Sequence, residues 1–82
     1  MKISFPIQIK YPSQYKKLVN FLDKYDFHWM EGQKPSGYTP SVALPFYVGC
    51  VERYGQHKLY YRTEEQFKTD PAYYNNNIEV EL

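Results

Sequence analysis

The stretch FHWMEGQKP, residues 27–35, holds the only tryptophan of this chain and lies where a helical pattern gives way to an extended one. The aromatic residues Phe27 and Trp29 alternate with their neighbours, which predicts a short strand over residues 27–30 with both rings on one face. We expect these rings to pack against the preceding helix. The glycine and the proline that follow predict the exit into a loop. The stretch is therefore interpreted as a determinant of the fold and not as an active site.

Two elements are predicted before this stretch. Apolar and polar residues alternate over residues 2–10, a pattern typical of a half-buried strand. Pro6 falls on the polar side of this strand and cannot donate a ladder hydrogen bond, which favours an edge position. Apolar residues at helical spacing then predict a helix over residues 14–25, with Ser13 as its N-cap.

A hairpin is predicted after the stretch. Glycines and prolines over residues 31–41 predict the longest loop of the chain. Residues 42–53 and 58–62 have the composition of strands, and the turn residues at 54–57 predict that the two strands pair with each other. We expect the first of these strands to be bent or bulged near its proline and its glycine.

The C-terminal part predicts a short helix and a last strand. Residues 63–66 match T-x-x-Q, the capping-box pattern, and predict a helix that reaches Lys68 and is ended by residues 70–71. A turn over residues 75–77 then leads to a strand over residues 78–82, and the alternating glutamates of this strand predict an acidic outer face.

The order β-α-β-β-β-short α-β predicts one α+β domain that spans residues 1–82. We expect a single, mainly antiparallel sheet with the one long helix packed on one face. A chain of 82 residues buries a small core, so its stability should be marginal. Cys50 is the only cysteine, which excludes a disulfide within the chain and favours a reducing compartment. Aromatic residues make up 20% of the chain, so we expect aromatic packing and self-association to supply stability.

The charge of the chain is nearly balanced overall but unevenly distributed. The formal net charge is +1, yet residues 1–34 carry six lysines and three acidic residues, whereas residues 64–82 carry one lysine and five acidic residues. A mimic of DNA would be more acidic, and a dedicated nucleic-acid binder would be more basic. No apolar run could span a membrane and the N-terminus has no signal-peptide core, so we expect a cytoplasmic protein without a membrane partner.

The residue types used in catalysis and metal binding do not form a recognisable pattern. The two histidines, His28 and His57, have no metal-ligand spacing to each other or to Cys50, so we expect no metal and no cofactor. Cys50 lies within an apolar strand, where a thiol packs as a small hydrophobic group. We therefore predict that the protein is not an enzyme. The alternative is a small enzyme that uses Cys50 or His28.

Two segments contain candidate binding residues. Residues 53–62 interleave basic and aromatic side chains, which can stack on bases and pair with phosphates. The same pattern is also typical of an ordinary hairpin with a tyrosine-rich core face. The loop over residues 31–41 is shaped by glycine and proline, and loops held by rigid elements often bind partners. The candidate binding residues of the two segments are Lys34, Tyr38, Arg53, Tyr54, Lys58, Tyr60, Tyr61 and Arg62.

The motif F-x-W-x-x-G-x-K-P at residues 27–35 resembles small proteins encoded by bacteriophages and prophages. In these proteins an opening strand and one helix precede an aromatic-x-W-x-x-G-x-x-P segment, and a loop and a hairpin follow it. The resemblance covers residues 1 to about 62 in the order of elements. It implies a non-enzymatic protein of the host bacterial cytoplasm that binds and inhibits a host defence or host replication protein, as anti-CRISPR proteins do.

Two other binding functions remain open. One is an oligomeric sponge that binds a small signalling nucleotide, since such a pocket needs only an aromatic residue, an arginine and backbone amides. The other is binding of single-stranded nucleic acid, which the weak net charge disfavours. We expect a homo-oligomer both for an inhibitor of a host protein and for a nucleotide sponge. A two-fold dimer is the commonest form. The first strand and residues 78–82 are the expected exposed edges, protected by Pro6 and the glutamates.

Overall fold

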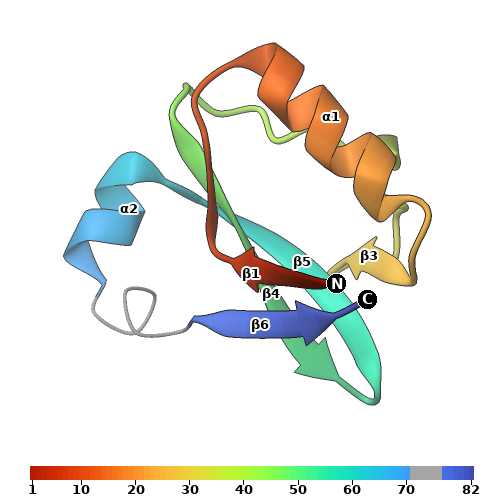
Figure 1. Ribbon diagram of the computed structural model, residues 1–82. Helices are drawn as coiled ribbons and strands as arrows, with labels where there is room; N and C mark the ends of the chain where they lie inside the picture. The colour runs from red at the N-terminus through yellow and green to blue at the C-terminus, as the bar shows by residue number, and fades with distance from the viewer. Residues whose placement is uncertain (71–76) are drawn as a thin grey trace.

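The computed structural model of the protein describes residues 1–70 and 77–82 (Figure 1). The elements in chain order are β1 (Lys2–Phe5), β2 (Ile7–Ile9), α1 (Pro12–Leu22), β3 (Phe27–Trp29), the 3-10 turn η1 (Pro35–Gly37), β4 (Phe46–Arg53), β5 (Gln56–Thr63), α2 (Glu64–Thr69) and β6 (Ile78–Glu81). The α+β class, the mainly antiparallel pairing and the one long helix are those predicted from the sequence. The predicted helix stop at Pro71 and residues 75–76 of the predicted turn lie outside the described residues.

Pro6 divides the first predicted strand into two strands that belong to different sheets. β1 pairs antiparallel with β6, and β2 pairs antiparallel with β4. The described residues therefore form a two-stranded sheet, β1-β6, and a four-stranded sheet in the order β2-β4-β5-β3, where the sequence predicts a single sheet. The reason is that proline has no N–H to continue a ladder, so the chain changes sheets there. The first and last strands, expected as exposed edges, pair with each other.

β4 and β5 form the predicted hairpin and the centre of the four-stranded sheet. Their antiparallel pairing ends with Arg53 opposite Gln56, so the turn consists of Tyr54 and Gly55 and not of the four residues predicted. β4 begins at Phe46, later than predicted, because the preceding proline cannot donate a ladder hydrogen bond. β3 pairs with β5 in parallel, the one parallel pair among the described strands.

α1 both begins and ends earlier than the sequence predicts. Pro12 occupies the first turn of the helix, where its missing N–H costs no helical hydrogen bond. The N-cap position therefore falls on Tyr11 and not on Ser13, and no side chain caps the helix there. At the other end the helix stops at Leu22, and the N–H of Tyr25 donates to the Leu22 carbonyl at 3.0 Å. Among the described residues, no helix is long and apolar enough to cross a membrane.

The core lies between α1, the four-stranded sheet and the β1-β6 pair. Figure 1 shows α1 beside one end of the sheet and the β1-β6 pair near its centre, and the rings of Phe5 and Phe27 lie 6.0 Å apart. Phe27 and Trp29 are 1% and 4% exposed, which confirms their predicted role in the fold. The buried apolar residues are Phe5, Ile9, Tyr15, Val19, Leu22, Phe27, Trp29, Phe46, Val48, Cys50, Leu59 and Val80.

Candidate binding site

β5 extends beyond its neighbour β3, and this difference in length leaves part of the β5 edge without a strand beside it. The last residue of β3, Trp29, lies opposite Leu59, whereas β5 continues to Thr63. The N–H of Met30 still donates to the Leu59 carbonyl at 3.2 Å, and the chain then turns at Gly32. A pocket of about 300 Å³ lies beside this edge. Its lining residues are Trp29, Met30, Glu31, Gln33, Tyr38, Leu59, Tyr60, Tyr61, Arg62 and Gln66.

Aromatic side chains form one wall of this pocket. The Trp29 indole donates its Nε1–H to the Pro35 carbonyl at 3.0 Å. Tyr38 packs against Trp29 edge-on, with 5.2 Å between ring centroids, and the Tyr61 ring lies 6.3 Å from the Tyr38 ring. From α1, the Tyr15 hydroxyl donates a hydrogen bond to the Tyr38 carbonyl. The wall is therefore fixed by the helix, the loop and the strand together.

Two polar groups of the pocket can exchange hydrogen bonds with a bound group. A hydrogen bond with the Tyr61 side chain raises the pKa of Tyr38, and burial and the negative charge of Glu31 act in the same direction. Tyr38 is therefore a neutral phenol at physiological pH, able to donate and to accept. The Oε1 atom of Gln33 is buried and accepts no hydrogen bond from the described residues. An unsatisfied amide oxygen beside a pocket is a ready acceptor for an N–H or O–H of a partner.

Side chains of β5 and α2 cover the backbone of the open edge. Arg62 donates from Nη1 to the Tyr61 carbonyl at 2.7 Å, and its guanidinium carbon lies 5.0 Å from the centroid of the Tyr60 ring. The N–H of Thr63 donates to the Oε1 atom of Gln66 at 3.0 Å, as part of the predicted capping box of α2. These two contacts cover one carbonyl and one N–H of this edge, which hinders the addition of another strand.

Tyr60 lies on the opposite face of the sheet from Tyr61 and covers Gly49. Gly49 and Tyr60 are opposite each other in the β4-β5 ladder, and a Cβ atom added to Gly49 would lie 2.3 Å from the Tyr60 ring. Glycine therefore leaves the space in which the ring lies flat on the sheet. The ring in turn supports the guanidinium of Arg62, which brings a positive charge to the lining of the pocket.

The position of α2 is set by a second aromatic contact on this outer face. The rings of Tyr47 in β4 and Phe67 in α2 are stacked, with 3.9 Å between centroids and 9° between planes. The hydroxyl of Tyr47 also accepts a hydrogen bond from Gln8 Nε2 at 3.1 Å. α2 is thus fastened to the centre of the sheet, which holds Gln66 at the pocket.

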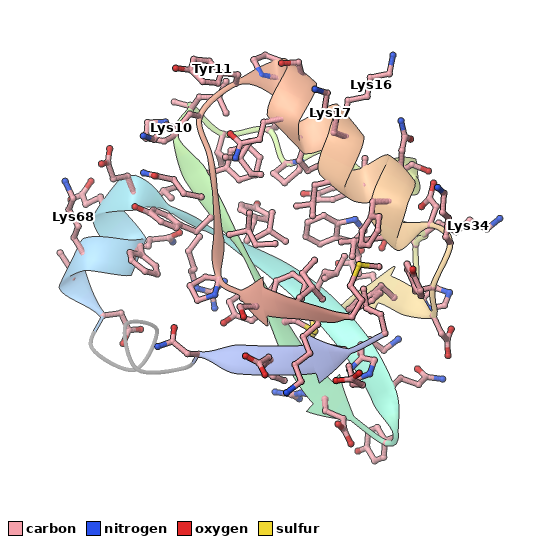
Figure 2. All side chains as sticks on the ribbon, viewed as in Figure 1. Lys10, Tyr11, Lys16, Lys17, Lys34 and Lys68 are labelled. Carbon is pink, nitrogen blue, oxygen red and sulfur yellow. The ribbon has the colours of Figure 1, made fainter. Side chains whose placement is uncertain are left out.

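The pocket brings together half of the predicted binding residues. Those that line it are Tyr38, Tyr60, Tyr61 and Arg62. Lys34 precedes η1 and points outward from the molecule (Figure 2). Lys58 lies in β5 opposite His28, short of the pocket. Arg53 and Tyr54 lie at the far end of the hairpin.

Six lining residues were not among the predicted binding residues: Trp29, Met30, Glu31, Gln33, Leu59 and Gln66. The sequence indicates Trp29 as a core residue, and its ring is both buried and part of the pocket wall. The end of the predicted strand before Gly32 could have indicated the loop residues Met30, Glu31 and Gln33 as lining residues. A chain that leaves a sheet exposes the edge of the neighbouring strand and can line the space beside it. Gln66 was recognised for its capping role alone, which is the role its side chain has here.

A separate basic surface surrounds the start of α1. Figure 2 shows Lys10, Tyr11, Lys16 and Lys17 at this end of the helix. Residues 10–22 contain three lysines and no acidic residue, which contributes to the uneven charge seen in the sequence. This end of the molecule therefore carries a positive potential that favours approach of an acidic partner.

The residues considered for catalysis lie on three different strands of the four-stranded sheet. Burial raises the pKa of Cys50 to about 12, and the Glu52 carboxylate adds to the shift, so the thiol is protonated at neutral pH. His57 stacks on Phe27 with 5.3 Å between ring centroids, and its Nδ1 atom is buried. His28 faces Asp26, with 3.5 Å between Nδ1 and Oδ1. Within residues 1–70 and 77–82, no three His, Cys, Asp or Glu side chains are grouped so that they could hold a metal ion.

Comparison with known proteins gives no relative. No protein-family model, no curated protein and no solved structure matches this chain. The function must therefore be inferred from the chemistry of its own residues.

Proposed function

We propose that this protein is a non-enzymatic binding protein of the phage type, which inhibits a host defence or host replication protein by binding to it in the bacterial cytoplasm. The observation that supports this most is the pocket beside the β5 edge, whose lining includes tryptophan, three tyrosines and an arginine. These residue types dominate the binding energy of protein interfaces, because they combine a large apolar area with polar atoms at the tip.

The size and shape of the pocket favour a side chain of a partner protein as the occupant. A volume of about 300 Å³ lies at the lower limit of small-molecule sites and suits one large side chain. Met30 lies at the rim and is 46% exposed, and an unbranched thioether adapts readily to the surface of a partner. The carboxylate of Glu31 and the guanidinium of Arg62 offer charges of both signs to polar groups around that side chain.

The test is capture of a partner from host lysate by three immobilised forms of the protein. Met30→Asp places a charge at the pocket rim, and Leu44→Asp places the same charge at a residue that is 40% exposed and does not line the pocket. Wild type and Leu44→Asp should retain one host protein in equimolar amount, whereas Met30→Asp should lose it. The proposal fails if no host protein is retained from several bacterial hosts, or if Met30→Asp retains it as well as wild type does.

A small signalling nucleotide is the second candidate. Tyr38 and Tyr61 offer ring faces for a base, and Arg62 offers a guanidinium for a phosphate group. A ligand that binds the native state at 100 times its Kd stabilises it by about 2.7 kcal/mol, so a panel of cyclic and linear nucleotides should raise the Tm if this function is correct. An unchanged Tm at millimolar nucleotide would exclude it. Light scattering on the same samples would show whether the chain forms the expected homo-oligomer.

A further inference from the structure

The tip of the β4-β5 hairpin places an aromatic side chain in a backbone conformation that disfavours it. Tyr54 has a φ angle of 54° and Gly55 a φ angle of 76°, so both residues of the two-residue turn are left-handed, as in a type I′ turn. Asparagine or aspartate followed by glycine is the preferred sequence for such a turn. In a left-handed residue the Cβ atom crowds the following carbonyl, so a tyrosine lowers the stability of the turn relative to asparagine.

No residue in the described part of the chain makes a contact with the Tyr54 side chain that would offset this cost. This side chain is 102% exposed, so it buries no apolar area. Among the residues that the structure describes, none makes a hydrogen bond, an ion pair or a ring contact with it. A side chain that costs stability and makes no compensating contact with residues 1–70 or 77–82 is explained by a contact with another molecule.

The neighbours of Tyr54 indicate the kind of molecule that it contacts. Arg53 is exposed and lies opposite Gln56, beside the aromatic ring in sequence. Glu52 is also exposed, so the two charged residues before the turn cancel. A tip without net charge is poorly suited to the phosphate backbone of nucleic acid, whose binding depends on several cations. Tyrosine next to arginine is instead the combination found at the centre of protein interfaces.

We propose that the hairpin tip is a second contact surface of this protein. The Tyr54 ring enters an apolar pocket of a partner protein, and Arg53 pairs with a carboxylate at the rim of that pocket. This rests on the proposed function, because the partner is the same host protein that contacts the pocket beside β5. At the tip, the Tyr54 side chain enters the partner, whereas the pocket beside β5 receives a side chain of the partner. The two surfaces therefore form separate parts of one interface.

The experiment is photo-crosslinking in the bacterial host. Benzoylphenylalanine is placed in three full-length proteins, in place of Tyr54, of Met30 and of Leu44, the last being the exposed control position. Irradiation should give one discrete protein adduct of the same mass from positions 54 and 30 and none from position 44. Mass spectrometry of the adduct identifies the host protein and the residues that the tip contacts, which should include a carboxylate within reach of Arg53.

The pattern of adducts separates this inference from the proposed function. An adduct from position 30 without one from position 54 overturns the role of the tip and leaves the function standing. Absence of adducts from both positions overturns both. An adduct at twice the mass of this chain, or one that is destroyed by nuclease, shows a second copy or a nucleic acid at the tip and likewise overturns the inference.

A stability measurement tests the strain argument by itself. Tyr54→Asn should raise the Tm by a few degrees, on the order of 4 °C, because asparagine suits the left-handed position. With benzoylphenylalanine in place of Gln56, the same substitution should reduce the adduct yield at least tenfold, since the anchoring ring is gone. A lower Tm in Tyr54→Asn, or an unchanged adduct yield, would show that Tyr54 serves the turn and not a partner.

Discussion

Trp29 and Tyr54 are both large aromatic residues at places where a strand ends, but the chain surrounds them differently. Trp29 is 4% exposed, its indole N–H is bonded to the Pro35 carbonyl, and its ring packs against Tyr38. Tyr54 is 102% exposed and left-handed. An aromatic residue whose ring and polar atom both find partners inside the chain belongs to the fold. One that finds neither is the residue for which we propose a contact with another molecule.

The strongest test of this contrast is truncation of the buried ring. Trp29→Ala should lower the free energy of unfolding by about 3–5 kcal/mol, because it leaves a cavity in the core and an unpaired carbonyl at Pro35. Urea denaturation followed by tyrosine fluorescence measures this change. A loss of less than about 1 kcal/mol would mean that the ring belongs to the pocket surface more than to the core.

A smaller effect is expected midway along the hairpin, where Tyr60 covers Gly49. Gly49→Ala should cost about 1–3 kcal/mol, because the new methyl group would lie 2.3 Å from the Tyr60 ring. The cost should largely disappear when Tyr60→Ala is combined with it, since the ring is then absent. The free energies of the two single variants and the double variant form a cycle, and strictly additive effects would show that the contact is relieved elsewhere.

The contribution of Tyr15, which hydrogen-bonds the pocket wall, to the free energy of unfolding should fall at alkaline pH. Burial raises the pKa of Tyr15 from 10.0 to about 12. The unfolded chain therefore releases this proton first, so its contribution is complete below pH 10 and is lost as the pH rises from 10 to 12. Solvent screening reduces the effect of this shift on stability, which leaves about 1–2 kcal/mol. Urea denaturation across this range should show a steeper decline for wild type than for Tyr15→Phe, and parallel curves would contradict the prediction.

The smallest effect is expected at the hairpin tip. Tyr54→Ala should change the free energy of unfolding by less than about 0.5 kcal/mol, because the side chain buries nothing. Both Trp29→Ala and Tyr54→Ala remove an aromatic ring, but only the first should lower the free energy of unfolding substantially. The same denaturation experiment measures both. A loss above about 1 kcal/mol would remove the distinction between the two aromatic residues.

Local patterns in the sequence predicted the parts of the fold that depend on neighbours in the chain. The alternation around Trp29, the hairpin on either side of Tyr54 and the capping box at Thr63 all appear in the structure. Each depends on residues a few positions apart, where side-chain period and turn chemistry decide the outcome. The N-cap was misplaced at Ser13 because Pro12 can itself begin a helix.

The remaining features depend on which strands become neighbours, and local patterns do not contain that information. Pro6 was recognised as a poor ladder member, but only the pairing of β1 with β6 shows that it separates two sheets. The pocket likewise results from the register that sets Trp29 opposite Leu59 while β5 continues. Its aromatic and arginine residues were indicated by composition, whereas Glu31 and Gln33 join them through the path of the loop.

The pairing of β1 with β6 also bears on the order in which the two sheets form, because it joins the two described strands that lie farthest apart in the sequence. The two strands come from opposite ends of the sequence, and the Leu82 N–H donates to the Met1 carbonyl at 2.8 Å. β1 is synthesised well before β6, with all the other described strands between them. The apolar face of β1 therefore has no strand beside it until β6 has been made, so we expect this two-stranded sheet to form after the β4-β5 hairpin.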